Sequence, residues 1–526
     1  MVLSNSNIKM IEFIEEINSK KTKRELGLRD KIKSQEWFFT FSGKLPNDWI
    51  EVNFMDVTWL ITCGVAKRPS YVEKGIPFLS AQNARPFSTN LNKIKYISEK
   101  EFKQLTVGGK PERNDILYTR VGNCGEAAKI KYDFEFAIYV SLTLIKPINE
   151  LIDSDYLVAF LNGYYGKVQA NVGAIGIGLK NLNVDNVRKY KIPLPPKLVQ
   201  QAIVSKIEEL FSELDKGIET LHLAQQQLKT YRQSVLKWAF EGKLTQEWRN
   251  NQQKLLTSKD FITEIIKRRE LDYKIKLETW NNRKFKSNGE KIPKPQKPSN
   301  IDPKNDLYEG LVEKENLPTE WEVIPLVFVS DNQPNSIVDG PFGSSINVNE
   351  DYIEEGVPVI RMVNIRPFRF VQDQMKFIKE SKFQSLRRHN ILPKDVLIAK
   401  VGATIGDCCI YPINQPEAML STTGSCRIRL DKNVMNAKFL EYNIFFHKNT
   451  LKEIASQTAQ PFLNMKVLKS FPIVLPTIEE QDNIVQAIES RLSVADKLEE
   501  SINQSLQQAE ALRQSILKRA FEGRLI

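Results

Sequence analysis

The chain has 526 residues and a formal net charge of +11, with 41% hydrophobic and 26% charged residues. This length allows several domains, and the moderate positive charge is compatible with nucleic acid without requiring it. No apolar run approaches the ~20 residues of a membrane span, and no two of the five cysteines form a Cys-x-x-Cys pair. Composition therefore argues against a membrane protein, a zinc ribbon and a disulfide framework, and we expect a protein of the reducing cytoplasm.

The chain divides into six segments. In chain order we predict an N-terminal arm at 1–45, a first head at 46–196, a long helix at 197–244, a central linker at 245–316, a second head at 317–476 and a second long helix at 477–526. The arm is interpreted as a partial copy of the linker, because Lys23-Arg24-Glu25-Leu26 resembles Arg268-Arg269-Glu270-Leu271 and each segment has a short helical stretch, at 11–17 and around 261–265.

Both heads have a mixed α/β pattern. Short β-rich runs alternate with turns rich in Gly, Pro and Asn, at 76–80, 116–119, 139–145, 357–363, 396–399 and 426–430. Variable loops interrupt them at 64–71 and 174–183 in the first head, and at 340–345 and 458–464 in the second. Loops on a rigid sheet commonly carry recognition residues, so these are the candidate binding segments.

The long helices are duplicates. Residues 200–244 align with 481–525 without a gap, nearly half of the positions are identical, and the copies end in AFEGKL and AFEGRL. Apolar residues recur at alternating steps of three and four, which predicts a heptad seam on each helix and two antiparallel coiled-coil helices. Prolines precede both helices, and Gly242 and Gly523 should end them. The predicted seam comprises Ile203, Ile207, Leu210, Leu214, Leu221, Leu228, Val235, Ile484, Ile488, Leu498, Ile502, Leu512 and Ile516.

Catalytic motifs are absent from the sequence. There is no Gly-x-x-x-x-Gly-Lys-Ser/Thr phosphate loop and no Asn/Asp-Pro-Pro-aromatic tetrad of an amino-methyltransferase. The three histidines, His222, His389 and His447, are scattered and lack ligand spacing. We therefore predict no catalytic residue, no metal site and no cofactor in this chain.

Shared markers occur in the same order in both heads. Leu45-Pro46-Asn47-Asp48-Trp49 returns as Leu317-Pro318-Thr319-Glu320-Trp321, and NARPF at 83–87 returns as NIRPF at 364–368. With the Gly340-Pro341-Phe342-Gly343-Ser344 loop, the Asp395 to Gly402 turn and the Pro193 to Ile203 exit, this order resembles the specificity subunits of type I restriction–modification systems. The resemblance covers about residues 46–526, and the first head departs from it by lacking the Pro-Phe-Gly-Ser string.

The resemblance implies a DNA-binding subunit without catalytic activity of its own. Each head would be a target recognition domain for one half of a split double-stranded DNA sequence, and the helices would set the spacing and dock two modification subunits. Those partners would bind S-adenosylmethionine and methylate adenine, and restriction subunits would supply the ATP- and Mg-dependent restriction activity. Two alternatives stay open: a two-headed protein-binding scaffold with a coiled-coil spacer, and a fragment of a self-contained restriction–modification polypeptide.

Candidate DNA contacts fall into two groups. Basic residues at matching positions in both heads cannot explain two different sequences, so we assign them phosphate or structural roles: Arg85, Arg120, Arg366 and Lys400. Side chains found in only one head are the candidates for reading bases or lining the recognition loops: Lys67, Arg68, Lys180, Asn181, Ser344, Ser345 and Gln460.

Overall fold

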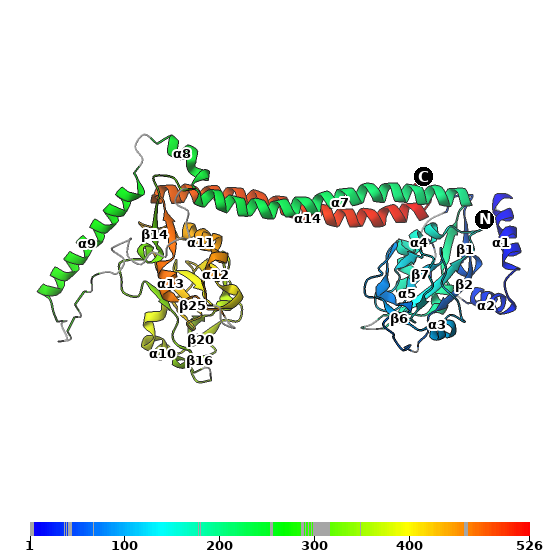
Figure 1. The fold of residues 1–526 in the computed structure, drawn as a ribbon, viewed down its shortest axis with the longest axis horizontal. Coiled ribbons are helices and arrows are strands. Elements are labelled where there is room, and N and C mark those ends of the chain that lie inside the picture. Colours follow the sequence, from blue (N-terminus) through cyan, green and yellow to red (C-terminus); the bar gives the residue numbers. More distant parts are fainter. Residues whose placement is uncertain are drawn as a thin grey trace. The chain divides into compact units, whose positions relative to one another are not determined.

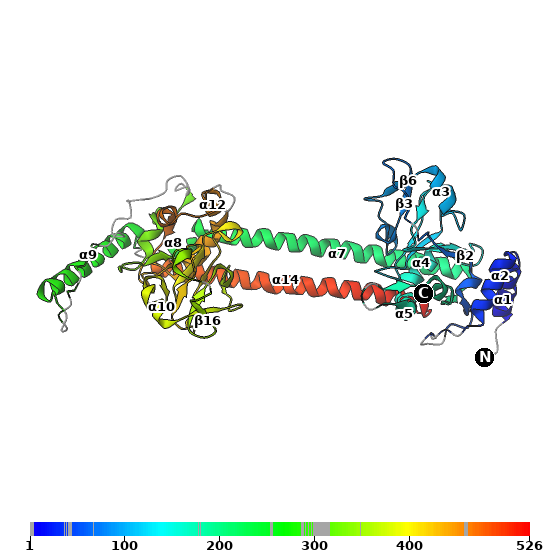
Figure 2. The same cartoon turned by 90° about the horizontal axis from the view of Figure 1, so that it is seen from below.

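The computed structural model describes residues 5–526 apart from 36, 38, 40, 42–44, 67, 177, 179, 253–255, 286–288, 290, 293, 296, 298–315, 348 and 457–460. The chain forms two compact units, Met1–Ala224 with Ser501–Ile526, and Gln225–Glu500. Each unit contains one mixed α/β head, the start of the long helix that follows it and the end of the other long helix (Figures 1 and 2). The predicted fold class is confirmed. The six segment boundaries stay predictions, because the two units divide the long helices.

The helices fall into three sets. The first unit contains α1 (Asn5–Asn18), α2 (Lys23–Lys33), α3 (Glu99–Leu105), α4 (Ser154–Asn162), α5 (Tyr164–Gly173) and α6 (Val184–Arg188). The second contains α8 (Gln246–Asn250), α9 (Ser258–Asn282), α10 (Glu380–Ser385), α11 (Ala437–Phe446), α12 (Lys448–Glu453) and α13 (Met465–Ser470). Both units share α7 (Lys197–Phe240) and α14 (Ile478–Phe521).

The first head is built around an antiparallel sheet of order β2-β10-β7-β8. A second sheet, β6-β3-β9, contains one parallel pair, and β1 pairs with β13, β4 with β5 and β11 with β12. The strands are β1 (Ile50–Asn53), β2 (Thr58–Cys63), β3 (Ile76–Leu79), β4 (Ala84–Arg85), β5 (Ser88–Thr89), β6 (Lys95–Ile97), β7 (Ile116–Thr119), β8 (Ala127–Lys129), β9 (Ala137–Ile138), β10 (Leu142–Pro147), β11 (Ala174–Ile175), β12 (Asn181–Leu182) and β13 (Lys191–Leu194).

The second head repeats this plan. Its antiparallel sheet has the order β15-β25-β22-β23, beside a five-stranded sheet β16-β20-β17-β24-β21 and the pairs β14-β26 and β18-β19. The strands are β14 (Glu322–Pro325), β15 (Ile337–Asp339), β16 (Tyr352–Ile353), β17 (Val357–Ile360), β18 (Ile365–Arg366), β19 (Arg369–Phe370), β20 (Lys376–Ile378), β21 (Asn390–Ile391), β22 (Val396–Ala399), β23 (Cys408–Ile410), β24 (Ala418–Leu420), β25 (Ser425–Ile428) and β26 (Pro472–Leu475).

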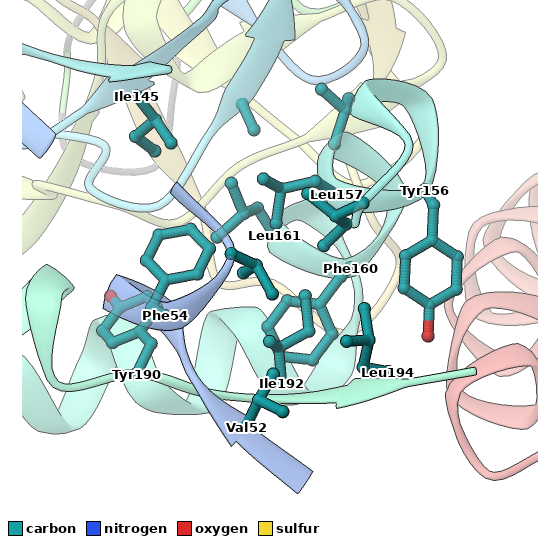
Figure 3. Packing of buried hydrophobic residues seen from close by; sticks show 14 of the residues in the cluster. Val52, Phe54, Ile145, Tyr156, Leu157, Phe160, Leu161, Tyr190, Ile192 and Leu194 are labelled. Atoms are coloured by element: carbon teal, nitrogen blue, oxygen red, sulfur yellow. The ribbon is translucent and has the colours of Figure 1, made fainter. Parts of the chain in front are cut away.

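The core of each head includes the end of a long helix. In the first unit Phe521 of α14 packs its ring 5.1 Å from Tyr156 and 5.3 Å from Phe160, both on α4. In the second unit Phe240 of α7 lies 5.4 Å from Phe439 on α11. These two phenylalanines belong to the repeated AFEG string, so the repeat is explained by an identical packing task. Figure 3 shows the first core, with α4 side chains packed against those of β1, the following turn and β13: Val52, Phe54, Tyr156, Leu157, Phe160, Leu161, Ile192 and Leu194.

The arm and the linker pack on their own heads in similar ways. Arg29 of α2 is buried and donates from Nε to Asp56 at 2.7 Å, in the turn after β1. Arg269 of α9 is also buried, donates from Nη2 to the carbonyl of Ser330 at 2.9 Å, and lies over the Phe328 ring at 4.8 Å. The sequence predicted only a short helix in the linker, whereas α9 has 25 residues.

The two long helices run antiparallel in both units (Figures 1 and 2). In the first unit Arg513 of α14 pairs with Asp215 of α7. In the second unit Arg232 of α7 pairs with Asp496 at 2.6 Å and with Glu499 at 2.7 Å on α14. Each helix ends where predicted, with Gly242 at φ 71° and Gly523 at φ 66°. Arg232 and Arg513 occupy equivalent positions in the two copies of the helix, and so do Asp215 and Asp496. The sequence therefore contained this signal, but the pattern of apolar residues alone did not indicate it.

The predicted seam needs correction on α14. Leu498 and Leu512 are 49% and 51% exposed, so they do not lie in the helix interface. Glu499 and Arg513, each one residue further along, carry the cross-helix ion pairs in their place. The physical reason is that a step of one residue turns a helix by about 100° and moves a side chain off the interface. The seam is most deeply buried where a head also covers it, at Ile203, Ile207, Val235, Ile484, Ile488 and Ile516, while Leu210, Leu214, Leu221, Leu228 and Ile502 are half-buried.

Glu480 forms a buried polar junction at the start of α14. Its carboxylate accepts hydrogen bonds from Arg249 at 2.5 Å, Thr245 at 2.7 Å and the Trp321 indole at 2.9 Å. Through these hydrogen bonds, the segment after α7 (Thr245 and Arg249) and the first residues of the second head (Trp321) contact the start of α14. Removing the carboxylate leaves a nearly buried guanidinium unpaired. We therefore expect Glu480→Ala to lower the free energy of unfolding by about 3–5 kcal/mol, measured by urea denaturation, with the exposed neighbour Glu479→Ala as the control.

Candidate nucleic-acid interface

One edge of the first four-stranded sheet gathers four loops. β2 and β7 end at this edge, and β10 and β8 begin there. Val65 bridges to Tyr139, Val121 bridges to Asn181, and the Arg120 N–H donates to the Ser141 carbonyl at 3.0 Å. These links bring together the described residues of the loops at 64–72, 120–126, 139–141 and 174–183. The two variable loops predicted as binding segments, although over 100 residues apart in sequence, therefore contribute to a single surface. We call this surface the recognition edge of the first head.

Arg120 ties this edge together. Its Nε donates to the Leu182 carbonyl at 2.9 Å, Nη1 to the Val140 carbonyl at 3.3 Å and Nη2 to the Asn181 side-chain oxygen at 3.4 Å. A guanidinium presents five N–H groups in a fixed fork, which suits it to hold several loop oxygens at once. Of the two roles predicted for Arg120, this geometry favours the structural one.

The second head has the equivalent recognition edge. Gly340 donates its N–H to the Ser425 carbonyl at 3.1 Å, as Gly64 does to Leu142 at 3.2 Å in the first head. Val401 bridges to Phe462, as Val121 does to Asn181. The loops at 340–346, 400–407, 421–425 and 461–464 therefore meet at one edge, again uniting the two predicted segments.

Lys400 is fully buried in the second recognition edge. Its Nζ lies 3.5 Å from the Asp339 carboxylate and 4.7 Å from the centre of the Phe462 ring. Its backbone N–H donates to Gly424 and its carbonyl accepts from Leu463, both at 2.8 Å. A fully buried, paired ammonium does not reach a phosphate, so Lys400 holds the loops as Arg120 does. The matched basic residue therefore contacts the neighbouring loops in both heads, and its role in binding stays a prediction.

Two glycines allow the recognition loops to pass close to the neighbouring strand. A Cβ on Gly64 would lie 2.1 Å from the carbonyl oxygen of Ile138, and one on Gly340 would lie 2.1 Å from that of Thr422. Backbone atoms cannot rotate away, so any side chain forces the loop off the sheet. We expect Gly340→Ala to cost about 1–3 kcal/mol of stability, measured by thermal unfolding. Gly343→Ala, in the same loop but facing open space, should be close to neutral; equal losses for both would contradict this account.

The remaining predicted contacts differ in accessibility. Arg68, Lys180, Asn181 and Ser344 are exposed on the recognition edges, and Ser345 is half-buried. Arg85 lies 3.8 Å from Glu126 and donates to its neighbour's carbonyl at 3.2 Å, and Arg366 donates to the Ile365 carbonyl at 3.3 Å. Lys67 and Gln460 lie outside the described residues. The exposed set is what a ligand can reach without rearrangement of the loops.

No group of three or more His, Cys, Asp or Glu side chains that could hold a metal ion occurs in the part of the chain that the structure describes. Burial lowers the pKa of His447 to about 4, and its ring packs against Phe446 and Phe471. Among the described helices, none combines the length and the apolar character needed to cross a bilayer.

Comparison with known proteins gives one consistent family. The model of the type I restriction modification DNA specificity domain matches residues 46–221 and 342–508. The EcoKI specificity subunit of Escherichia coli K12 is 22% identical over 500 residues, covering 92% of this chain and 90% of that protein. The EcoBI specificity subunit of Escherichia coli is 27% identical over 369 residues, covering 69% and 64% of the two chains.

Solved structures show the same fold. A chain from a type I R-M system superimposes with a TM-score of 0.60 at 16% identity, covering 92% of this chain and all of the other. The HsdS subunit from Thermoanaerobacter tengcongensis superimposes with a TM-score of 0.51 at 15% identity, covering 92% of this chain and 99% of that one.

Proposed function

Because the chain belongs to the family of type I restriction modification DNA specificity domains, we propose that each of its heads reads one half of a bipartite DNA target. The observation that carries this proposal is the pair of recognition edges. Both are built on the same sheet order and the same glycine and basic supports, yet they expose different side chains: Arg68, Lys180 and Asn181 in the first head, Phe342 and Ser344 in the second. One scaffold with two different surfaces fits two different half-sites.

DNA chemistry distinguishes contacts that position the protein from contacts that read the sequence. Phosphates position a protein without conveying sequence, whereas base edges in the major groove carry distinct donor and acceptor patterns. Arg68 is exposed in the first loop, and an arginine can form two hydrogen bonds to guanine. Lys180 and Asn181 belong to the same recognition edge, on the hairpin held by Arg120.

The long helices would act as the spacer between half-sites. A helix of 44 residues spans about 65 Å, which caps the separation near 19 base pairs. Two major-groove faces one turn apart, about 34–36 Å, fit within this cap. The seam supports the spacing role, since two separate ion pairs between α7 and α14 fix the register of the two helices.

The same helices would dock two modification subunits. Apolar side chains stay exposed along them, including Leu223 at 53%, Val494 at 55% and Leu498 at 49%. In the first unit a cleft of about 520 Å³ is lined by both apolar and charged side chains, with Phe211 and Arg513 among them. On this proposal the partners supply S-adenosylmethionine binding, adenine methylation and, with restriction subunits, the ATP- and Mg-dependent steps, while this chain supplies sequence specificity without catalysis.

Mapping methylated adenines in host DNA tests the proposed function. Deleting the gene should abolish methylation at one bipartite sequence, and restoring it should return the same sequence. A protein-binding scaffold predicts unchanged methylation and salt-insensitive binding of its partners. Unchanged methylation after deletion would therefore reject the proposal.

Arg68 and Arg120 offer a matched pair of variants. Arg68→Ala should relax discrimination at one base pair by ~1–3 kcal/mol, because one bidentate contact is lost. Arg120→Ala should weaken binding and relax discrimination at several base pairs together, because it releases the hairpin that presents Lys180 and Asn181. Affinities for a panel of single-base target variants at two salt concentrations separate the two patterns. An equal loss on every variant for Arg68→Ala would reject its role as a reader.

A further inference from the structure

The second recognition edge presents one bare aromatic ring. Phe342 is 73% exposed, the largest exposed fraction among the aromatic side chains that the structure describes. Within the described residues the ring has neither an aromatic nor a cationic partner. Covering an exposed apolar ring with a binding partner is favourable, because it removes apolar surface from water.

The loop holds this ring on a fixed backbone. On one side Gly340 donates to Ser425 at 3.1 Å and Pro341 is buried; on the other, Ser345 donates its N–H to the Phe342 carbonyl at 2.8 Å. Ile346 then enters an apolar cluster and is 7% exposed. The exposure of the ring is therefore a consequence of well-anchored flanks.

The neighbours of Phe342 leave room for a flat partner. Gly343 has no side chain, and a Cβ there would face open space. Ser344, the next residue, is small and exposed. A benzene ring has no hydrogen-bonding group, so it contributes to binding through its faces and edge alone.

The first head has no equivalent ring. Counting from the matched glycines Gly64 and Gly340, Phe342 corresponds to Ala66. Tyr71, an exposed aromatic residue of that loop, is 42% exposed and has Lys95 Nζ 4.3 Å from the centre of its ring. A bare ring on the recognition edge therefore distinguishes the second head.

We propose that Phe342 is a positioning residue that inserts its ring beside a base of the second half-site and partly unstacks it. Apolar side chains, Phe among them, wedge between base steps in this way, and stacking on an aromatic ring tolerates any base. Enzymes that modify a base must take it out of the stack, at a cost of a few kcal/mol for unpairing and unstacking. A wedge on the specificity subunit would lower that cost for a modification subunit. This inference rests on the proposed function.

The test uses the full chain produced together with its modification subunits. Duplexes of the mapped target carry 2-aminopurine at successive positions of each half-site, since its fluorescence rises when it unstacks. The modification subunits are expected to unstack the methylated adenine in both half-sites. At the other positions, binding should raise the fluorescence at one step of the second half-site only. Phe342→Ala should remove this rise and weaken binding to every sequence about 10-fold. Phe342→Trp, which keeps an aromatic face for stacking, should retain both the fluorescence rise and the wild-type affinity.

A matched control and a second substitution in the DNA separate the outcomes. Phe285→Ala removes another exposed ring, 58% exposed in the linker, and should change nothing. An unchanged fluorescence rise and affinity for Phe342→Ala would overturn the proposal. The proposal would also be overturned if Phe342→Ala lowered the affinity only for targets with thymine at one position, and if replacing that thymine with deoxyuridine lowered the affinity of the wild-type complex in the same way. The ring would then read the methyl group of the thymine. If the wild-type complex binds no DNA at all, the proposed function itself fails.

Discussion

Replacing residues 46–195 with the corresponding head of another specificity subunit should change one half of the methylated sequence and leave the other half as it was. The physical reason is that each recognition edge is assembled entirely within its own head, from four loops held by local hydrogen bonds. Mapping methylated adenines in cells that carry the exchanged gene measures the outcome.

The exchange must preserve the packing of the head on the helices. Tyr156 and Phe160 contact Phe521 of α14, so an incoming head needs aromatic residues at those two positions. The reciprocal exchange of residues 317–476 should change the other half and serves as the control. If either exchange changed both halves, the model of two independent heads would be wrong.

Shortening both long helices by one heptad should shorten the unspecified gap of the target by about 3 base pairs, or abolish methylation. The matched deletion removes residues 217–223 of α7 and 505–511 of α14. The register follows from the ion pairs, since Asp215 lies opposite Arg513 and Arg232 lies opposite Asp496. Each heptad contributes about 10 Å of helix, and base pairs rise about 3.4 Å each.

A single deletion provides the control for this prediction. Removing 217–223 alone takes Asp215–Arg513 and Arg232–Asp496 out of register with each other and should destabilise the helix pair, which a lower melting temperature would show. The matched deletion should keep the melting temperature close to that of the parent. An unchanged gap with full methylation after the matched deletion would mean that the helices do not set the spacing.

The sequence by itself determined the duplication, the ends of the two long helices and a minority of the strands. Helix ends depend on local chemistry, so Gly242 and Gly523 could be recognised directly as left-handed stops. Of the predicted β-rich runs, 116–119 and 396–399 coincide with β7 and β22. The run at 139–145 was predicted as one strand, but a turn occupies its first half and β10 begins at Leu142.

Only the tertiary structure decided which segments form each recognition edge and which basic residues are free. The loops at 64–72 and 174–183 meet because β2 and β7 both pair with β10, a long-range choice that local patterns do not encode. Burial likewise depends on distant partners: Lys400 and Arg120 have matching sequence contexts, yet Lys400 is sealed between Asp339 and Phe462. Charge as well as apolar spacing decided which side chains of α14 face α7, since Arg513 lies in the interface between the helices and Leu512 does not. Periodicity is a local property, whereas these contacts depend on which strands and helices become neighbours.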